Sequence, residues 1–133
     1  MIKHSIQTDG QDELKDITEL VQEEVTKSGA QSGFVFVYCP HTTAGITINE
    51  NADPDVKRDM IERWKNVYPW ETESDRHMEG NTAAHMKAST VGASEQIMIE
   101  NGRLVLGRWQ GIYFCEFDGP RSRELMIKIT PDR

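Results

Sequence analysis

The feature that most constrains the fold is the segment 33–39, Gly-Phe-Val-Phe-Val-Tyr-Cys, which is almost entirely β-branched or aromatic. A run of seven such residues is too short for a helix and is typical of a buried central strand. Pro40 ends the run, and the polar segment His-Thr-Thr follows at once. The sequence therefore predicts a sheet at the centre of the fold, with a polar loop at one end of a buried strand.

Further strands are expected where apolar and polar residues alternate or form short apolar runs. Asn101-Gly102 lies between two such segments and is the signal for a tight hairpin turn. The expected strands besides 33–39 are residues 2–7, 46–49, 97–100, 103–106, 111–117 and 125–130.

Three helices are expected between these strands. The first runs from about residue 12 to a stop at Gly29, because the apolar residues recur with a helical period. The second begins at Asp53-Pro54, an N-cap followed by proline in the first turn, and ends before Pro69. The third is short and covers residues 81–88. The apolar stripes are Leu14, Ile17, Leu20, Val21 and Val25 in the first helix and Val56, Met60, Trp64 and Val67 in the second.

Together these elements predict one α+β domain over residues 1–133, with a largely antiparallel sheet, two long helices and one short helix. The net charge of −7 and the lack of clustered Lys and Arg exclude a duplex nucleic-acid binder and disfavour an anionic membrane surface. Cys39 and Cys115 both lie in apolar runs, and no apolar signal segment follows Met1, so we expect reduced thiols and a cytoplasmic location.

Three histidines lie in polar segments beside turns, where functional sites concentrate. His41 directly follows the buried strand, His77 lies in the acidic loop 71–80, and His85 lies on the short helix. Three imidazoles would leave a position open on a Zn²⁺-like ion, as in catalytic metal sites. Solvated surface histidines are the alternative, since His77 and His85 lack the i, i+4 spacing of a helical metal motif.

Acidic, basic and amide residues near these segments are further candidates. Glu50 and Glu116 belong to or follow apolar strands and would act as a general base or orient a histidine, unless they simply face solvent. Arg121 follows the turn Gly119-Pro120 and is a candidate anion clamp, with Arg123 on the same strand face. The supporting candidates for substrate binding are Asn49, Asn51, Asn81 and Lys87.

Four motifs in order resemble the secondary thiamine-phosphate synthase (YjbQ-type) family and, with the flanking elements, cover nearly the whole chain. They are HTTAGITINEN (41–51), RHMEGNTAAHMK (76–87), LGRWQGI (106–112) and EFDGPR (116–121). The third departs from the family pattern at Arg108, where a threonine is usual. The resemblance implies a sandwich-like, mostly antiparallel α+β fold, a homotrimer, and a metal or anion position among His41, His77 and His85.

The family's proposed activity joins hydroxymethylpyrimidine diphosphate to thiazole phosphate and releases pyrophosphate. On this hypothesis a divalent ion neutralises the diphosphate, and Arg121 and Lys87 hold its oxygens. Histidine ligands favour Zn²⁺, whereas diphosphate chemistry favours Mg²⁺, so both metals stay open. Two alternatives use the same residues: a metal-dependent phosphoesterase acting on a small phosphorylated substrate, and a non-enzymatic trimer that binds a metal or a small anion.

Overall fold

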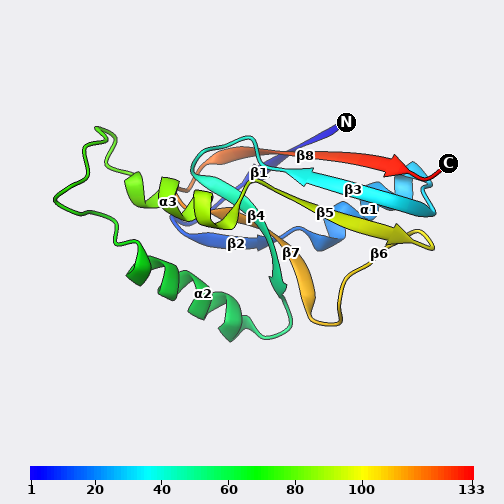
Figure 1. Cartoon of the computed structure of the whole chain (residues 1–133), viewed down its shortest axis with the longest axis horizontal. Helices are drawn as coiled ribbons and strands as arrows, with labels where there is room; N and C mark the ends of the chain where they lie inside the picture. The colour runs from blue at the N-terminus through cyan, green and yellow to red at the C-terminus, as the bar shows by residue number, and fades with distance from the viewer.

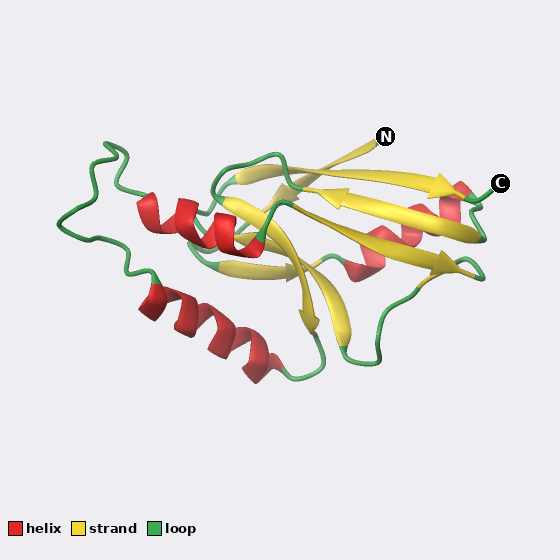
Figure 2. Cartoon of the chain, in the orientation of Figure 1, coloured by secondary structure: helices red, strands yellow, loops and turns green.

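The computed structural model describes all residues 1–133 and contains two antiparallel sheets and three helices (Figures 1 and 2). The larger sheet has the order β1-β8-β3-β5-β6 and the smaller one the order β2-β7-β4. The strands are β1 (Ile2–Gln7), β2 (Glu13–Asp16), β3 (Ser32–Tyr38), β4 (Ala44–Glu50), β5 (Ser94–Glu100), β6 (Arg103–Leu104), β7 (Gln110–Glu116) and β8 (Ser122–Pro131). The predicted α+β class with mostly antiparallel sheets is confirmed.

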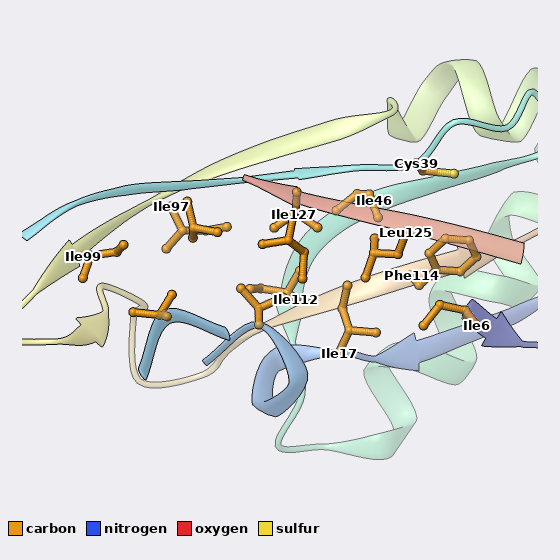
Figure 3. Close-up of a cluster of buried hydrophobic side chains, with 14 of the residues drawn as sticks. Ile6, Ile17, Cys39, Ile46, Ile97, Ile99, Ile112, Phe114, Leu125 and Ile127 are labelled. Atoms are coloured by element: carbon orange, nitrogen blue, oxygen red, sulfur yellow. The ribbon is translucent and has the colours of Figure 1, made fainter. Parts of the chain in front are cut away.

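The main hydrophobic core lies between the two sheets and α1 (Thr18–Ser28). Figure 3 shows its isoleucine, leucine and phenylalanine side chains pointing toward one another from both sheets. Val35 and Val37 of β3 are fully buried there, as expected for the central strand. No helix has the length and apolar character needed to cross a bilayer.

Strand β7 is buried on both faces, which makes the smaller sheet the middle layer of the molecule. Ile112 and Phe114 point into the main core, whereas Tyr113 and Cys115 point into a second core. This alternation follows from the two-residue period of a strand. Helices α2 (Pro54–Val67) and α3 (Thr82–Val91) cover the second core, with Ala84 of α3 fully buried in it.

Two helix predictions were wrong in detail. Residues 13–16 form strand β2, paired with β7, and α1 begins only at Thr18. Leu14 and Ile17 are buried, but the pairing of β2 outweighs their helical spacing. Helix α2 begins and ends as predicted, and its N-cap Asp53 accepts the Asp55 N–H at 2.9 Å. However, α2 has no fully buried residue, and Val67 is exposed, because the helix rests on the edge of the second core.

The hairpin at Asn101-Gly102 is present, with a β6 of only two residues. Asn101 and Gly102 both have positive φ, as this tight turn requires. Between α2 and α3, residues 68–81 form a long loop that extends away from both sheets (Figure 2). This loop carries His77 and brings the chain back to α3, where the candidate site begins.

Candidate functional site

A polar cavity of about 390 Å³ lies where four segments of the chain meet, and none of its lining residues is hydrophobic. The segments are the β3–β4 loop, the α2–α3 loop, the first turn of α3, and the β7–β8 turn with the start of β8. The lining residues are Pro40, His41, Thr42, Thr43, His77, Glu79, Asn81, His85, Asp118, Arg121 and Arg123.

The β3–β4 loop fixes the ring of His41. Its Nε2 accepts the backbone N–H of Glu124 at 2.9 Å, so the proton of the neutral ring is on Nδ1. Burial, with the positive charge of Arg123, lowers the pKa of His41 below its ordinary value of 6.5. His41 is therefore a neutral hydrogen-bond donor at this wall of the cavity.

His77 and His85 form an edge-to-face pair that also lines the cavity. Their ring centroids are 5.3 Å apart and the rings meet at 80°. His77 Nε2 also lies 4.0 Å from Oε1 of Glu79, a carboxylate from the same loop. Gly80, with φ of +69°, turns the chain between Glu79 and α3. Two imidazoles and a carboxylate in one wall can transfer protons to and from a ligand.

The β7–β8 turn presents Arg121 to the cavity. Its Nε donates to the Asp118 carbonyl at 2.7 Å and its Nη2 to Asp118 Oδ2 at 2.9 Å. The side chain is half exposed, so its remaining N–H groups are free for a ligand. The turn requires glycine at 119, because a Cβ there would lie 2.4 Å from the carbonyl oxygen of Gly10.

Beneath the cavity lies a buried network that we call the ionic floor: Thr8, Thr43, Glu116 and Arg123. Arg123 Nε donates to Glu116 Oε2 at 2.7 Å, and its Nη2 donates to Glu116 Oε1 and, at 2.8 Å, to Thr43 Oγ1. Thr8 Oγ1 donates to Glu116 Oε2 at 2.9 Å and accepts the Arg121 N–H at 2.9 Å. The floor thus holds the β3–β4 loop and the Arg121 turn together.

Glu116 stays ionised in the floor. Burial alone would raise its pKa, but hydrogen bonds from Arg123, the Asp118 N–H and Thr8 outweigh burial and lower it. Both carboxylate oxygens are occupied and the side chain is fully buried. Glu116 therefore orients the site, and its carboxylate has no access to a ligand in the cavity.

Asn81, the N-cap residue of α3, has one buried polar atom without a partner. Its Nδ2 donates to Asp118 Oδ2 at 2.8 Å, which fixes the amide orientation, while Oδ1 accepts no hydrogen bond. A buried acceptor without a donor costs about 1–3 kcal/mol. Since Asn81 lines the cavity and is 95% buried, a ligand O–H or N–H would remove this cost.

The structure brings His41, His77, His85 and Arg121 around one cavity, and these four residues are called the rim below. Lys87, predicted to bind substrate, is instead 98% buried and paired with Asp12 at 2.7 Å, within the second core. The aliphatic part of a lysine side chain packs against apolar groups. Lys87 can therefore point inward from its helix, because the Asp12 carboxylate pairs with its ammonium group.

Asn49 and Glu50 do not belong to this site. They lie at the far end of β4, about 20 Å along the strand from Thr43. Asn49 Oδ1 accepts the Glu50 N–H at 2.7 Å, and Glu50 borders a separate hollow beside Asp53 and Trp109. Asn51 lies beyond them and donates to Asp16. These side chains cannot contact a ligand held by the rim of the same chain.

The rim does not form a metal site in this arrangement. No three histidine, cysteine, aspartate or glutamate side chains converge closely enough to hold an ion. His41 uses Nε2 for a backbone hydrogen bond, and its other nitrogen carries the proton. A metal ligand must offer a free lone pair, so His41 would have to give up this bond first.

The cysteines offer no nucleophile to the site. Cys39 and Cys115 are free and buried. Burial raises the pKa of the Cys39 thiol to about 11, and it raises that of Cys115 further. Both thiols are protonated at neutral pH, and it is the thiolate that reacts.

Five lining residues had no predicted role in the site: Pro40, Thr42, Thr43, Glu79 and Asp118. Glu79 follows His77 by two residues in a segment without apolar period, and Asp118 precedes the Gly-Pro turn, where it anchors Arg121. Their proximity to predicted residues was the only available signal. Arg123 was predicted as a second anion contact, but its guanidinium is paired with the Glu116 carboxylate.

Comparison with known proteins gives a consistent family assignment. Residues 2–132 match the model of the family described as UPF0047 protein YjbQ-like. The chain is 66% identical to UPF0047 protein YugU of Bacillus subtilis over 124 residues, covering 93% of this chain and 94% of that protein. It is 47% identical to a UPF0047 protein of Methanocaldococcus jannaschii, covering 100% and 96% of the two chains.

Solved structures agree with this assignment. A crystal structure of an uncharacterised conserved YjbQ/UPF0047 protein from Clostridium acetobutylicum superposes with a TM-score of 0.95 at 55% identity, covering 98% of this chain and all of that one. A YbjQ-like protein of unknown function from Sulfolobus solfataricus superposes with a TM-score of 0.93 at 32% identity, covering 98% and 96%. Sequence and fold together show that the chain belongs to the YjbQ-like UPF0047 family.

Proposed function

We propose that the polar cavity binds the phosphate groups of a small substrate and that the chain is a thiamine-phosphate synthase. The observation that carries the proposal is the rim: three imidazoles and a half-exposed guanidinium surround a cavity with no hydrophobic lining residue. Such a cavity offers hydrogen-bond donors and acid–base groups, which phosphate esters require, and no surface for an apolar ligand.

Charge in the cavity favours binding through donated hydrogen bonds. Arg121 is paired with Asp118 and Arg123 with Glu116, and the Glu79 carboxylate also lines the cavity beside His77, so a phosphate would be held by directed hydrogen bonds and not by a net positive charge. The free N–H groups of Arg121 give charged hydrogen bonds of about 1.5–3 kcal/mol each. The N-terminus of α3, which has no acidic residue in its first turn, adds about 0.3–1 kcal/mol. Arg121 is therefore the main anchor.

The proposed reaction breaks the carbon–oxygen bond between the pyrimidine methylene and the diphosphate. The bonding electrons leave with pyrophosphate, and the thiazole nitrogen donates a lone pair to the methylene carbon. His85, with His77 beside it, protonates the departing oxygen, while Arg121 and the Nδ1–H of His41 hold oxygens of the diphosphate. These assignments use only groups that line the cavity.

A phosphoesterase is the second candidate; the rim holds no ligand set for the metal that the sequence predicted with it, but one observation favours hydrolysis. Hydrolysis needs only a phosphate ester and water, and the polar cavity has no apolar wall for a second organic substrate. The third candidate, a non-enzymatic binder of a metal or small anion, predicts binding without turnover.

One assay separates these functions. The purified protein is incubated with hydroxymethylpyrimidine diphosphate, with and without thiazole phosphate, and thiamine phosphate, pyrophosphate and inorganic phosphate are quantified. Thiamine phosphate that appears with wild type and with R103Q, an exposed arginine on β6, but not with R121Q, supports the synthase. Phosphate release without thiazole phosphate would favour the esterase. Binding without any product would overturn both enzyme readings.

We also infer that copies of the chain associate through the outer face of the larger sheet, as expected for a homotrimer. Phe34, Tyr38 and Met98 are exposed on that face, and Phe34 pairs in register with Met98. A sheet face in water is normally polar, and a contiguous apolar patch marks an interface. Light scattering tests this inference: wild type should have three times the mass of the double variant F34K/M98K, and a monomeric wild type would refute it.

A further inference from the structure

The acidic loop, residues 71–80, is anchored at both ends but exposed along its whole length. Before it, Trp70 packs against the second core, and after it, Asn81 is 95% buried. Every residue between these two anchors is exposed. Figure 2 shows the loop projecting beyond the ends of α2 and α3. The loop is therefore a tethered segment on the surface, beside the polar cavity.

The hydrogen bonds of the acidic loop all stay inside it. The Thr72 hydroxyl donates to the Asp75 carboxylate at 2.8 Å, and the Gly80 N–H donates to the His77 carbonyl at 3.1 Å. No hydrogen bond or ion pair joins the loop to the rest of the chain, and its aromatic contact there is the ring of His77 against His85. Segments with so few contacts open at a low free energy. The loop can therefore move while the fold stays intact.

Movement of the acidic loop would open and close the polar cavity, because the loop supplies His77 and Glu79 to its lining. Gly80 follows these two residues and has φ of +69°. A Cβ at Gly80 would meet no atom within 4 Å, so there is open space around this turn. Small residues at the end of a loop are frequent hinges of lids that close over a ligand.

The cavity has no cation that is free to meet an anion. The guanidinium of Arg121 is paired with Asp118, and that of Arg123 with Glu116. Glu79 adds a third carboxylate to these two pairs. A phosphate group brings about two more negative charges. A further source of positive charge is therefore expected when a phosphate is bound.

Arg76 is the one guanidinium or ammonium group in the cavity-forming segments that has no carboxylate partner. It is exposed and makes no hydrogen bond or ion pair, although Asp75 directly precedes it in the chain. His77, which lines the cavity, directly follows it, and consecutive Cα atoms are about 3.8 Å apart. The long side chain of Arg76 thus needs only a local turn of the loop to enter the cavity.

We propose that the acidic loop is a lid that closes over an anion in the polar cavity, and that Arg76 contacts the anion when the lid is closed. This inference rests on the proposed phosphate site and adds a binding residue and a gate to it. A guanidinium binds phosphate oxygens bidentately, and closure excludes water from around the pair. Arg76 then supplies the positive charge that the paired arginines of the cavity lack.

Binding of inorganic pyrophosphate, measured by titration calorimetry on the full chain, tests the role of Arg76. R76Q changes an exposed side chain without partners, so it keeps the fold, and R103Q on β6 is the matched control. We expect R76Q to bind pyrophosphate at least about tenfold more weakly than the wild type, because a charged hydrogen bond is lost. R103Q should stay within about twofold of the wild type.

Limited digestion with trypsin tests the closure. Arg76 is the only lysine or arginine in the acidic loop, so cleavage after it gives the fragments 1–76 and 77–133. Saturating pyrophosphate should slow this cleavage at least about fivefold in the wild type, because proteolysis follows the population of the open loop. The same concentration should leave the cleavage rate unchanged in R121Q, which lacks the anchor of the anion.

Wild-type affinity in R76Q would overturn the lid and leave the phosphate site standing. Cleavage after Arg76 at an unchanged rate in wild type saturated with pyrophosphate would do the same. Failure of the wild type to bind pyrophosphate would overturn the proposed phosphate site, and the lid with it.

Discussion

Two arginine–carboxylate pairs lie two residues apart in the chain and have opposite roles. Arg123–Glu116 in the ionic floor is 94% and 100% buried, whereas Arg121–Asp118 at the rim is 50% and 86% buried. The charge types are the same, but solvent reaches only the second guanidinium. Burial makes the first pair part of the framework, and partial exposure leaves the second able to bind a ligand.

The largest expected effect comes from breaking the floor. R123Q leaves the buried Glu116 carboxylate without a counter-charge, and such changes cost about 3–5 kcal/mol. R121Q, the matched control, removes an exposed pair worth no more than about 1 kcal/mol. Urea unfolding followed by circular dichroism gives both free energies. Equal losses in the two variants would contradict the division into floor and rim.

The rim should show the reverse pattern, with a large effect on turnover and a small one on stability. We expect H85Q to lower the rate of product formation about a hundredfold, or about 2.7 kcal/mol, because a positioned general acid is lost. Its unfolding free energy should stay within about 0.5 kcal/mol of wild type. The variant E23Q, at an exposed position on α1, serves as a control, and turnover of H85Q at the wild-type rate would exclude His85 from the chemistry.

The rim and the ionic floor should also lose their contributions to folding stability at different pH values. The folded protein holds the pKa of His41 below the unfolded value of 6.5, so the unfolded chain binds more protons as the solution is acidified. Stability from His41 is complete above pH 6.5 and is lost as the pH falls below it. Glu116, whose pKa is lowered from 4.5, loses its contribution only at more acidic pH.

Measuring unfolding free energies at pH 7.5 and pH 5.5 tests this separation. The decrease should be smaller in H41Q, whose amide oxygen can accept the Glu124 N–H but does not titrate. An unchanged decrease in H41Q would mean that other groups cause it.

The sequence predicted the rim better than the floor for a physical reason. Histidine and arginine in polar segments beside strand ends are visible in a sequence, because their neighbours are polar too. Glu116 lies in an apolar strand, and only the fold reveals that Arg123 and Thr8 occupy its oxygens. Lys87 likewise meets Asp12 across 75 positions of chain, which no local pattern encodes.

The same reasoning applies to the fold. Strands β3, β5 and β7 were predictable from their own residues, because alternation and β-branched runs are local signals. Strand β2 was not, because Leu14 and Ile17 also match a helical spacing and the pairing with β7 decides between the two. The two ends of α2 were predictable because local residues set them: the N-cap Asp53 with Pro54 in the first turn, and Pro69 after the last turn. Its partial exposure was not, because it depends on packing against the second core.

The smallest effect is expected for E50Q, which changes a carboxylate that belongs neither to the ionic floor nor to the rim. Glu50 lies at the opposite end of β4 from the rim, and its one contact through the side chain, accepting the Asp53 N–H at 3.3 Å, survives as an amide oxygen. Turnover should stay within about twofold and stability within about 0.5 kcal/mol. D53N changes another carboxylate that lines the same hollow, and its turnover and stability should stay within the same limits. Since Glu50 cannot reach the rim of its own chain, a large loss of turnover in E50Q, with stability intact, would mean that it acts on the rim of a neighbouring copy, and the site would then span two chains.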